Sequence, residues 1–335
     1  MKFIRTFDKD ISPDQLGLTN CHEHIVCRPA YWIEKKVDDL LLDDPEKSIL
    51  DLQDFVRFGG RSIVDATAID YGRDVNAVYA ISKKAGVQVV GTAGFNKSFL
   101  WDTKVPAHLK PIIGNFETYK DWVELSSIEQ LVDHVVREVT IGLEGTTIKA
   151  GQVKFGTGYN SITPLEEKTI RVIARAHKLT GAPIHSHCEA GTMAIEQMKI
   201  LLSEDINMSV VSFGHMDRNI DLYYYEKLAE TGAYLSFDGL GKNKYGPESA
   251  RIDAIIALIK MGYENQILLG GDTARKTYYK HYGYYGLGLG WMLETWLPRF
   301  VDQCNRAGLD GKQLAQKLLV ENPARYLTFR EIHHD

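Results

Sequence analysis

The chain has 335 residues, of which 44% are hydrophobic and 25% charged, so it can bury a large core as globular proteins do. Its net charge of -5 argues against general affinity for nucleic acid, because a polyanionic backbone is met by basic surfaces. The first residues contain no apolar core of signal-peptide length, and no run approaches about 18 apolar residues. We therefore expect a cytoplasmic protein without membrane contact.

Short apolar runs rich in β-branched residues recur along the chain and predict eight strands. They cover residues 16–22, 61–67, 86–95, 151–158, 182–188, 209–215, 232–239 and 265–272. Helical patterns lie between them, at 163–181, 219–232 and 249–262, and each of these ends on a glycine. The first has Thr163 as a possible N-cap, Pro164 at its first position and Glu166 to close a capping box.

Strand and helix alternate without a polar linker, which favours a single (β/α)8 TIM barrel of the α/β class over residues 1–335. The rival is an open, doubly wound sheet. Its dinucleotide-binding version is disfavoured because no GxGxxG motif follows the first strand.

Histidines and an aspartate lie where such a barrel carries its active site, at the C-terminal ends of the strands. The residues are His22 and His24 on the first strand, Lys154 on the fourth, His187 on the fifth, His215 on the sixth and Asp272 on the last. Side chains alternate across a strand, so His22 and His24 point the same way. We interpret this set as a metal site.

The other histidines are treated separately. His185 shares a face with His187 but lies one layer deeper, so its part as a ligand stays open. We expect surface or helical positions for the remaining ones, which are His108, His134, His177, His281, His333 and His334. Four widely spaced cysteines, Cys21, Cys27, Cys188 and Cys304, indicate reduced thiols. We expect Cys21 and Cys188 to face the packing between barrel and helices.

Five motifs resemble, in order and spacing, the phosphotriesterase and lactonase family of the amidohydrolase superfamily. They are "CHEHI", "QVKFGTG", "HSHCEAG", "VSFGHMD" and "ILLGGD". The resemblance implies a binuclear centre, with zinc as the usual metal, manganese as its alternative, and a homodimer. His22 and His24 match ligands of the more buried ion, shared with Asp272, and His187 and His215 match those of the more exposed ion. Lys154 matches the lysine that carries CO2 as a carbamate and bridges both ions.

Chemistry supports a modified lysine, because an ammonium cannot ligate a metal whereas a carbamate offers two anionic oxygens. Lys149 is the competing candidate. We favour Lys154 because its distance from the helix at 163 suits a short strand-to-helix loop. A solvated loop charge is the alternative for either residue.

Two divalent ions hold hydroxide near neutral pH and polarise a bound carbonyl, so hydrolysis is the expected reaction. Asp272, ligating the buried ion and touching the bridging hydroxide, is the candidate to pass the proton from the attacking hydroxide to the leaving group. Replacement by asparagine should then retain metal and lose most activity.

The substrate class is suggested by the loops after the last two strands. Lys242 and Lys244 follow the seventh strand, Arg275 and Lys276 follow the eighth, and Tyr278 offers a hydroxyl. A cluster of cations suits a small anionic substrate that carries a phosphate monoester group. Neutral triesters have no such charge for the cations to bind. Lys244, Arg275, Tyr278 and Lys242 are therefore the predicted phosphate-binding residues. The chain thus resembles the branch that opens phosphorylated sugar 1,4-lactones, by attack of the bridging hydroxide on the lactone carbonyl.

Other functions stay open. A phosphotriesterase or arylesterase would act on neutral organophosphates or acyl-lactones. An amidase or deaminase would use the same barrel and metals. A non-catalytic protein would use the metal site for stability alone. Gly239 follows Asp238 where phosphotriesterases tend to carry a histidine. Asp217 could serve a proton relay or cap the helix near Asn219. The loop 278–291 could form a lid or pack aromatic rings at the barrel mouth.

Overall fold

The computed structural model describes residues 2–331, so His333 and His334 lie outside the described residues. All eight predicted strands are present, and the third is divided at Gly91, where a Cβ atom would clash with the ring of Phe7. The strands are β3 (Thr19–Glu23), β4 (Ser62–Asp65), β5 (Gln88–Val90), β6 (Thr92–Gly94), β7 (Gln152–Thr157), β8 (Ile184–Cys188), β9 (Val211–Phe213), β10 (Tyr234–Phe237) and β11 (Ile267–Leu269).

These strands form a closed parallel barrel. β3, β4 and β5 pair in order, as do β6 to β11. The last strand returns to the first because the backbone N–H groups of Gly271 and Asp272 donate to the carbonyl oxygen of His22 at 3.3 and 2.8 Å. The expected barrel is confirmed, and the open-sheet alternative is wrong.

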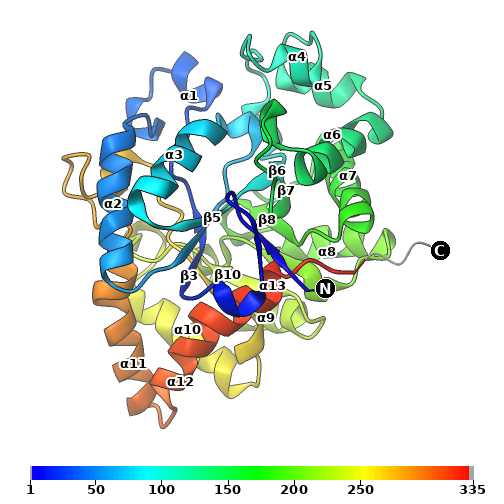
Figure 1. The fold of residues 1–335 in the computed structure, drawn as a ribbon. Coiled ribbons are helices and arrows are strands. Elements are labelled where there is room, and N and C mark those ends of the chain that lie inside the picture. Colours follow the sequence, from blue (N-terminus) through cyan, green and yellow to red (C-terminus); the bar gives the residue numbers. More distant parts are fainter. Residues whose placement is uncertain (1, 332–335) are drawn as a thin grey trace.

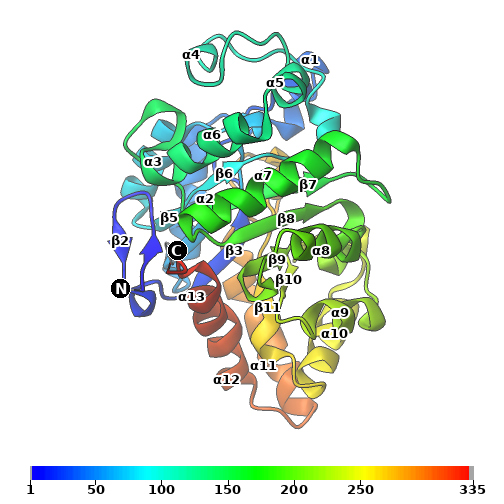
Figure 2. The same cartoon turned by 90° about the vertical axis from the view of Figure 1, so that its right-hand side faces the viewer.

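Helices surround the barrel, as Figures 1 and 2 show. The predicted helices at 163–181, 219–232 and 249–262 are confirmed as α7 (Pro164–Thr180), α9 (Leu222–Ala229) and α10 (Glu248–Lys260). The helices are α1 (Ala30–Glu34), α2 (Pro45–Arg57), α3 (Val75–Ala85), α4 (Lys110–Ile113), α5 (Tyr119–Leu125), α6 (Ile128–Thr140), α7 (Pro164–Thr180), α8 (Ala194–Ser203), α9 (Leu222–Ala229), α10 (Glu248–Lys260), α11 (Leu297–Arg306), α12 (Gly311–Gln316) and α13 (Asn322–Leu327). None of the helices among residues 2–331 combines the length and apolar character needed to span a bilayer.

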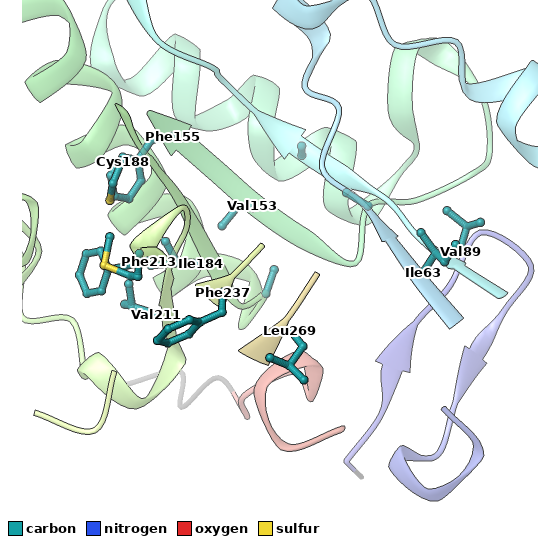
Figure 3. Close-up of a cluster of buried hydrophobic side chains, with 14 of the residues drawn as sticks. Ile63, Val89, Val153, Phe155, Ile184, Cys188, Val211, Phe213, Phe237 and Leu269 are labelled. Carbon is teal, nitrogen blue, oxygen red and sulfur yellow. The ribbon is translucent and has the colours of Figure 1, made fainter. Parts of the chain in front are cut away.

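Alternation along the strands separates two hydrophobic clusters. Outward side chains such as Val153, Phe155 and Ile184 are fully buried against the helices (Figure 3). The second cluster joins inward residues of the strands, such as Val64 and Val90, to a hairpin of β1 (Ile4–Arg5) and β2 (Asp10–Ile11) and to α13. The hairpin and α13 thereby cover the end of the barrel opposite the strand ends that carry chemistry.

The two cysteines next to predicted ligand histidines differ in their packing. Cys188 joins the outer cluster, as expected. The expectation for Cys21 is wrong, because Cys21 lies in the second cluster with Val64. A β-bulge explains this: Asn20 pairs with Ile63 and Glu23 with Asp65, which leaves both Cys21 and His22 opposite Val64.

Candidate functional site

A cavity of about 280 Å³ opens at the C-terminal ends of the strands. Its walls include all six predicted metal ligands, which are His22, His24, Lys154, His187, His215 and Asp272. The structure thus brings together residues that are as far as 250 positions apart in the chain, because parallel strands end at one rim.

The first group of donors is formed by His22, His24 and Asp272, whose ligand atoms lie within 4.8 Å of one another. The Asp272 Oδ1 atom is 3.6 Å from His22 Nε2 and 3.5 Å from His24 Nε2. Burial lowers the pKa of His24 to about 4, so this ring is neutral and has a lone pair to offer. Two imidazoles and a carboxylate are a donor set suited to a divalent transition metal.

The second group is formed by His187 and His215. Nδ1 of His187 and Nε2 of His215 are 2.8 Å apart, and their ring centroids are 4.4 Å apart. Burial lowers the pKa of His215 to about 4 and that of His187 well below its ordinary value. The Nε2 atom of His187 is held by Glu189 at 2.8 Å, and Lys97 pairs with the same carboxylate oxygen.

The second ring nitrogens of the other predicted ligand histidines are also held by neighbours. His24 Nδ1 is 2.7 Å from the hydroxyl of Thr67, which in turn donates to Asp65. His215 Nδ1 is 2.6 Å from Asp238 Oδ1, and His22 Nδ1 is 3.3 Å from Asp238 Oδ2. Such contacts orient each ring and determine which nitrogen is free to bind a metal.

His185 lies deeper in the barrel than the two donor groups. Its Nε2 atom is 3.0 Å from His22 Nδ1, and it does not belong to the lining of the cavity. It therefore supports His22 from below.

Lys154 lies on β7 with only 1% of its surface exposed. Its ammonium group donates to the carbonyl oxygen of Ala66 at 2.8 Å. Burial lowers the pKa of this amine to about 8, which increases the fraction of the neutral form. Lys149, the competing candidate, precedes β7 and does not line the cavity.

Asp272 connects the donor groups to positive charge at the mouth. Its Oδ2 atom accepts from Arg218 at 2.5 Å and from Lys242 at 2.6 Å. Burial opposes ionisation, but Lys242, the bond with His24 and Arg218 together hold the pKa of Asp272 well below its ordinary value. Its backbone has φ of +44°, a conformation that costs energy for a residue with a Cβ atom.

The predicted phosphate-binding residues are partly in the cavity wall. Lys242, Arg275 and Tyr278 line it, whereas Lys244 is exposed just outside the lining. The Lys244 ammonium lies 5.4 Å from the ring centroid of Tyr278, and the Arg275 guanidinium 6.0 Å from the same ring. Lys276 points elsewhere, pairing with Asp38 at 2.8 Å.

The structure adds wall residues that sequence reasoning missed. Arg218 and Lys97 bring two further cations to the cavity, and Trp32, Tyr71 and Phe99 form an aromatic side. Arg218 follows His215 by three residues, so its position close to a strand end was a usable signal. The aromatic residues gave no comparable signal, because they come from connecting segments without a motif.

Asp217 has a structural role. Its Oδ2 atom accepts from Arg251 at 2.7 Å and from the backbone N–H of Gly239 at 3.0 Å. It does not line the cavity, and the cap of α9 is Asp221. The interpretation of Asp217 as the cap of this helix is therefore wrong, and its ion pair with Arg251 gives it a structural role.

The loop 278–291 is packed at its base and exposed at its tip. Tyr279 and Tyr282 are buried, whereas Tyr285 is 99% exposed. The carboxylate of Asp51 accepts from backbone N–H groups at both ends of the loop, those of Lys280, His281 and Leu289. The base of the loop is therefore held by packed aromatic rings.

Comparisons with known proteins agree with this geometry. A model of the phosphotriesterase family matches residues 3–327. A phospho-furanose lactonase from Mycoplasmopsis synoviae is 33% identical, over 98% of this chain and 93% of that protein. The crystal structure of a lactonase from Listeria monocytogenes is 63% identical with a TM-score of 0.97, over 98% of this chain and 100% of that one. A phosphotriesterase homology protein from Escherichia coli, with phosphate in its active site, is 29% identical with a TM-score of 0.82, over 94% and 99% of the two chains.

Proposed function

The chain belongs to the phosphotriesterase family, and we propose that it is a metal-dependent lactonase that opens a phosphorylated sugar 1,4-lactone. The observation that carries this proposal is one cavity that joins imidazole and carboxylate donors to converging cationic side chains. A relative named phospho-furanose lactonase and another with phosphate in its active site support the substrate class.

The donor sets fit two divalent ions. His22, His24 and Asp272 would hold one, and His187 with His215 the other. Imidazole nitrogen suits zinc, and the carboxylate oxygen also suits manganese. When bound, such ions lower the pKa of water and polarise an ester carbonyl.

Lys154 would complete both sets as a carbamate. Its neutral amine attacks CO2, the new N–C bond forms, and one proton leaves for solvent. Burial beside the two histidine groups and a pKa of about 8 support this step, because the neutral amine is the reactive form. The product carries one negative charge, which is compatible with neighbouring divalent ions where an ammonium is not.

Asp272 would move the proton during ring opening. Its Oδ1 atom faces the histidines, so it lies where an attacking water loses its proton. The same carboxyl group would then protonate the ring oxygen that leaves when the C–O bond breaks. Lys242 and Arg218 hold Oδ2 and thereby orient the carboxylate.

The substrate phosphate would bind at the rim. The charges of Lys244 and Arg275 both lie near the ring of Tyr278, and a phosphate bound there would meet these two cations and the Tyr278 hydroxyl. Arg275 would then exchange its ion pair with Asp39, which lies 3.1 Å away, for the phosphate. The Lys242 ammonium lies 5.2 Å from the same ring centroid and connects this group to Asp272. The phosphate would therefore fix the distance between the lactone carbonyl and the metal ligands.

The test compares a pentono-1,4-lactone with its 5-phosphate, using metal-loaded protein and following proton release. We expect a strong preference for the phosphate that is lost in Lys244→Ala and Arg275→Ala. Lys280→Ala is the matched control, because Lys280 lies on the same loop and pairs outward with Asp54 at 3.5 Å. Equal rates on both lactones, or unchanged rates in the two variants, would refute the phosphate site.

A second candidate is hydrolysis of neutral aryl or acyl esters. The aromatic side of the cavity favours it, since Trp32 and Phe99 lie with ring centroids 6.1 Å apart and offer apolar contact to such a group. The same assay with an acyl-lactone and an organophosphate triester decides between the two candidates. A higher kcat/KM for either neutral ester would favour this second function.

A further inference from the structure

We propose that Asp238 positions one histidine in each of the two donor groups, so that a single carboxylate orients ligands of both metal positions. This inference rests on the proposed function, because it requires both positions to hold an ion. Asp238 directly follows β10 and is fully buried, and it does not line the cavity. It therefore acts through other residues and is a positioning residue.

The two oxygens of Asp238 contact histidines from different donor groups. Oδ1 is 2.6 Å from Nδ1 of His215, and Oδ2 is 3.3 Å from Nδ1 of His22. Oδ2 also accepts from the backbone N–H of His215 at 3.0 Å. One side chain thus holds a ring from β3 and a ring from the end of β9.

These contacts determine which nitrogen each ring presents. A carboxylate only accepts hydrogen bonds, so Nδ1 of both rings carries the proton and Nε2 keeps its lone pair. At His22 this proton is shared with Nε2 of His185, which lies 3.0 Å from the same nitrogen. Nε2 of His22 faces Asp272 Oδ1 at 3.6 Å, and Nε2 of His215 faces His187 Nδ1 at 2.8 Å. Both free nitrogens therefore point into their own donor group.

Gly270 provides the space for this arrangement. It follows β11, the strand between β10 and β3 in the closed barrel. A Cβ atom at Gly270 would lie 3.0 Å from the Cβ of His22 and 3.2 Å from the Cβ of Asp238, closer than side chains normally pack. Glycine at this position lets Asp238 reach His22 across the intervening strand.

The backbone of His215 gives a further reason for the contact. Its φ is +62°, in the left-handed region that a residue with a Cβ atom adopts at a cost. The hydrogen bond from its backbone N–H to Asp238 fixes this conformation at the same time as the ring is oriented.

The other outer contacts serve one position each. Thr67 holds His24, and Glu189 holds His187. Within residues 2–331, Asp238 is the side chain whose hydrogen bonds and ion pairs reach a histidine of both donor groups. Thr67→Val is therefore a matched comparison that disturbs one metal position only.

The experiment titrates Zn²⁺ into apoprotein in competition with a chromophoric chelator, which yields the number of ions and their stepwise dissociation constants. In Asp238→Asn, one acceptor oxygen replaces two, so we expect both constants to rise by roughly 10- to 100-fold. In Thr67→Val, only one constant should rise. Wild-type constants in Asp238→Asn, or weakening of a single position, would overturn the inference. Failure of the wild-type protein to bind two ions would instead overturn the proposed function.

Gly270→Ala keeps the test valid if apo Asp238→Asn does not fold. The variant retains every polar group and places a methyl group against the Cβ and backbone nitrogen of His22 and the Cβ of Asp238, which pushes the two residues apart. Circular dichroism establishes that each apoprotein is folded before titration. A smaller rise of both constants in Gly270→Ala supports the inference, and unchanged constants overturn it.

Discussion

The floor and the rim of the cavity share one opening but are built differently. On the floor, His22, Lys154 and His215 are each only 1% exposed and lie on a strand or directly after one. On the rim, Lys244 is exposed and Arg275 half-buried, and both lie on loops after β10 and β11. The floor is therefore positioned by the barrel, whereas the rim depends on supports of its own.

Those supports are buried charged side chains. Arg251, on α10, donates to the backbone oxygens of Lys242 and Gly246, both at 2.8 Å, and so holds the loop after β10. Asp51, on α2, holds the loop after β11 through its three backbone contacts. On the proposed function, the floor would set the reaction type and the rim the choice of substrate, and four predictions test this division.

The largest effect is expected on the floor, from Asp272→Asn. The amide cannot take up the proton, so kcat should fall by about 10²- to 10⁴-fold on phosphorylated and neutral lactones alike. The histidines and Lys154 should retain the metal, which elemental analysis of the purified variant measures. Full activity in the metal-loaded variant would remove Asp272 from proton transfer.

The next effect is on the support of the rim, from Arg251→Met. Asp217 and Glu248 each lie 2.7 Å from Arg251, and the variant leaves two buried carboxylates without their partner. We expect a loss of about 3–5 kcal/mol in the free energy of unfolding, measured by urea denaturation. Arg306→Ala, which breaks an exposed pair with Asp302, is the control and should change stability far less. Equal losses would show that Arg251 is not a special support.

Lys242→Met tests the residue that joins floor to rim. Its ammonium binds Asp272 and lies over the ring of Tyr278. Since a hydrogen bond to a charged group contributes about 1.5–3 kcal/mol, kcat/KM should fall by roughly 10- to 100-fold. Steady-state assays should show this loss for neutral and phosphorylated lactones together. A loss confined to the phosphate would place Lys242 wholly in the rim.

The smallest effect is expected from Tyr278→Phe, which removes a hydroxyl and keeps the ring. A neutral hydrogen bond contributes about 0.5–1.5 kcal/mol, so KM for the phosphorylated lactone should rise by roughly 2- to 10-fold. The neutral lactone serves as the internal control, because it has no group to accept this bond. A rise in both KM values would mean that the ring, not the hydroxyl, had moved.

The floor could be predicted from sequence because strand alternation and strand ends determine where its side chains point. Local irregularity limited even this part: the bulge that turns Cys21 inward leaves no mark in the hydrophobic pattern. The rim was harder to predict. Lys242 and Lys244 are two residues apart, yet one binds Asp272 and the other is exposed, since loop conformation and not periodicity decides between them.

Contacts between side chains from distant elements also could not be predicted from the sequence. Asp238 was noted only for its following glycine, because its contacts with His22 and His215 appear once the barrel closes. Arg218 was missed although it stands three residues after His215, because its contact with Asp272 likewise appears only once the barrel closes. The hairpin of β1 and β2 was missed for another reason: strands of two residues are too short for periodicity to reveal.

The bonds that close the barrel bear on the order of events during synthesis. Glu23, on β3, accepts from the backbone N–H of Thr273, 250 residues later, next to the bonds between His22 and Asp272. Such a pairing has a large loop-closure cost and forms late in folding. A nascent chain still emerging from the ribosome therefore displays separate histidines but no complete metal centre. Metal capture is thus deferred until nearly the whole polypeptide has been made.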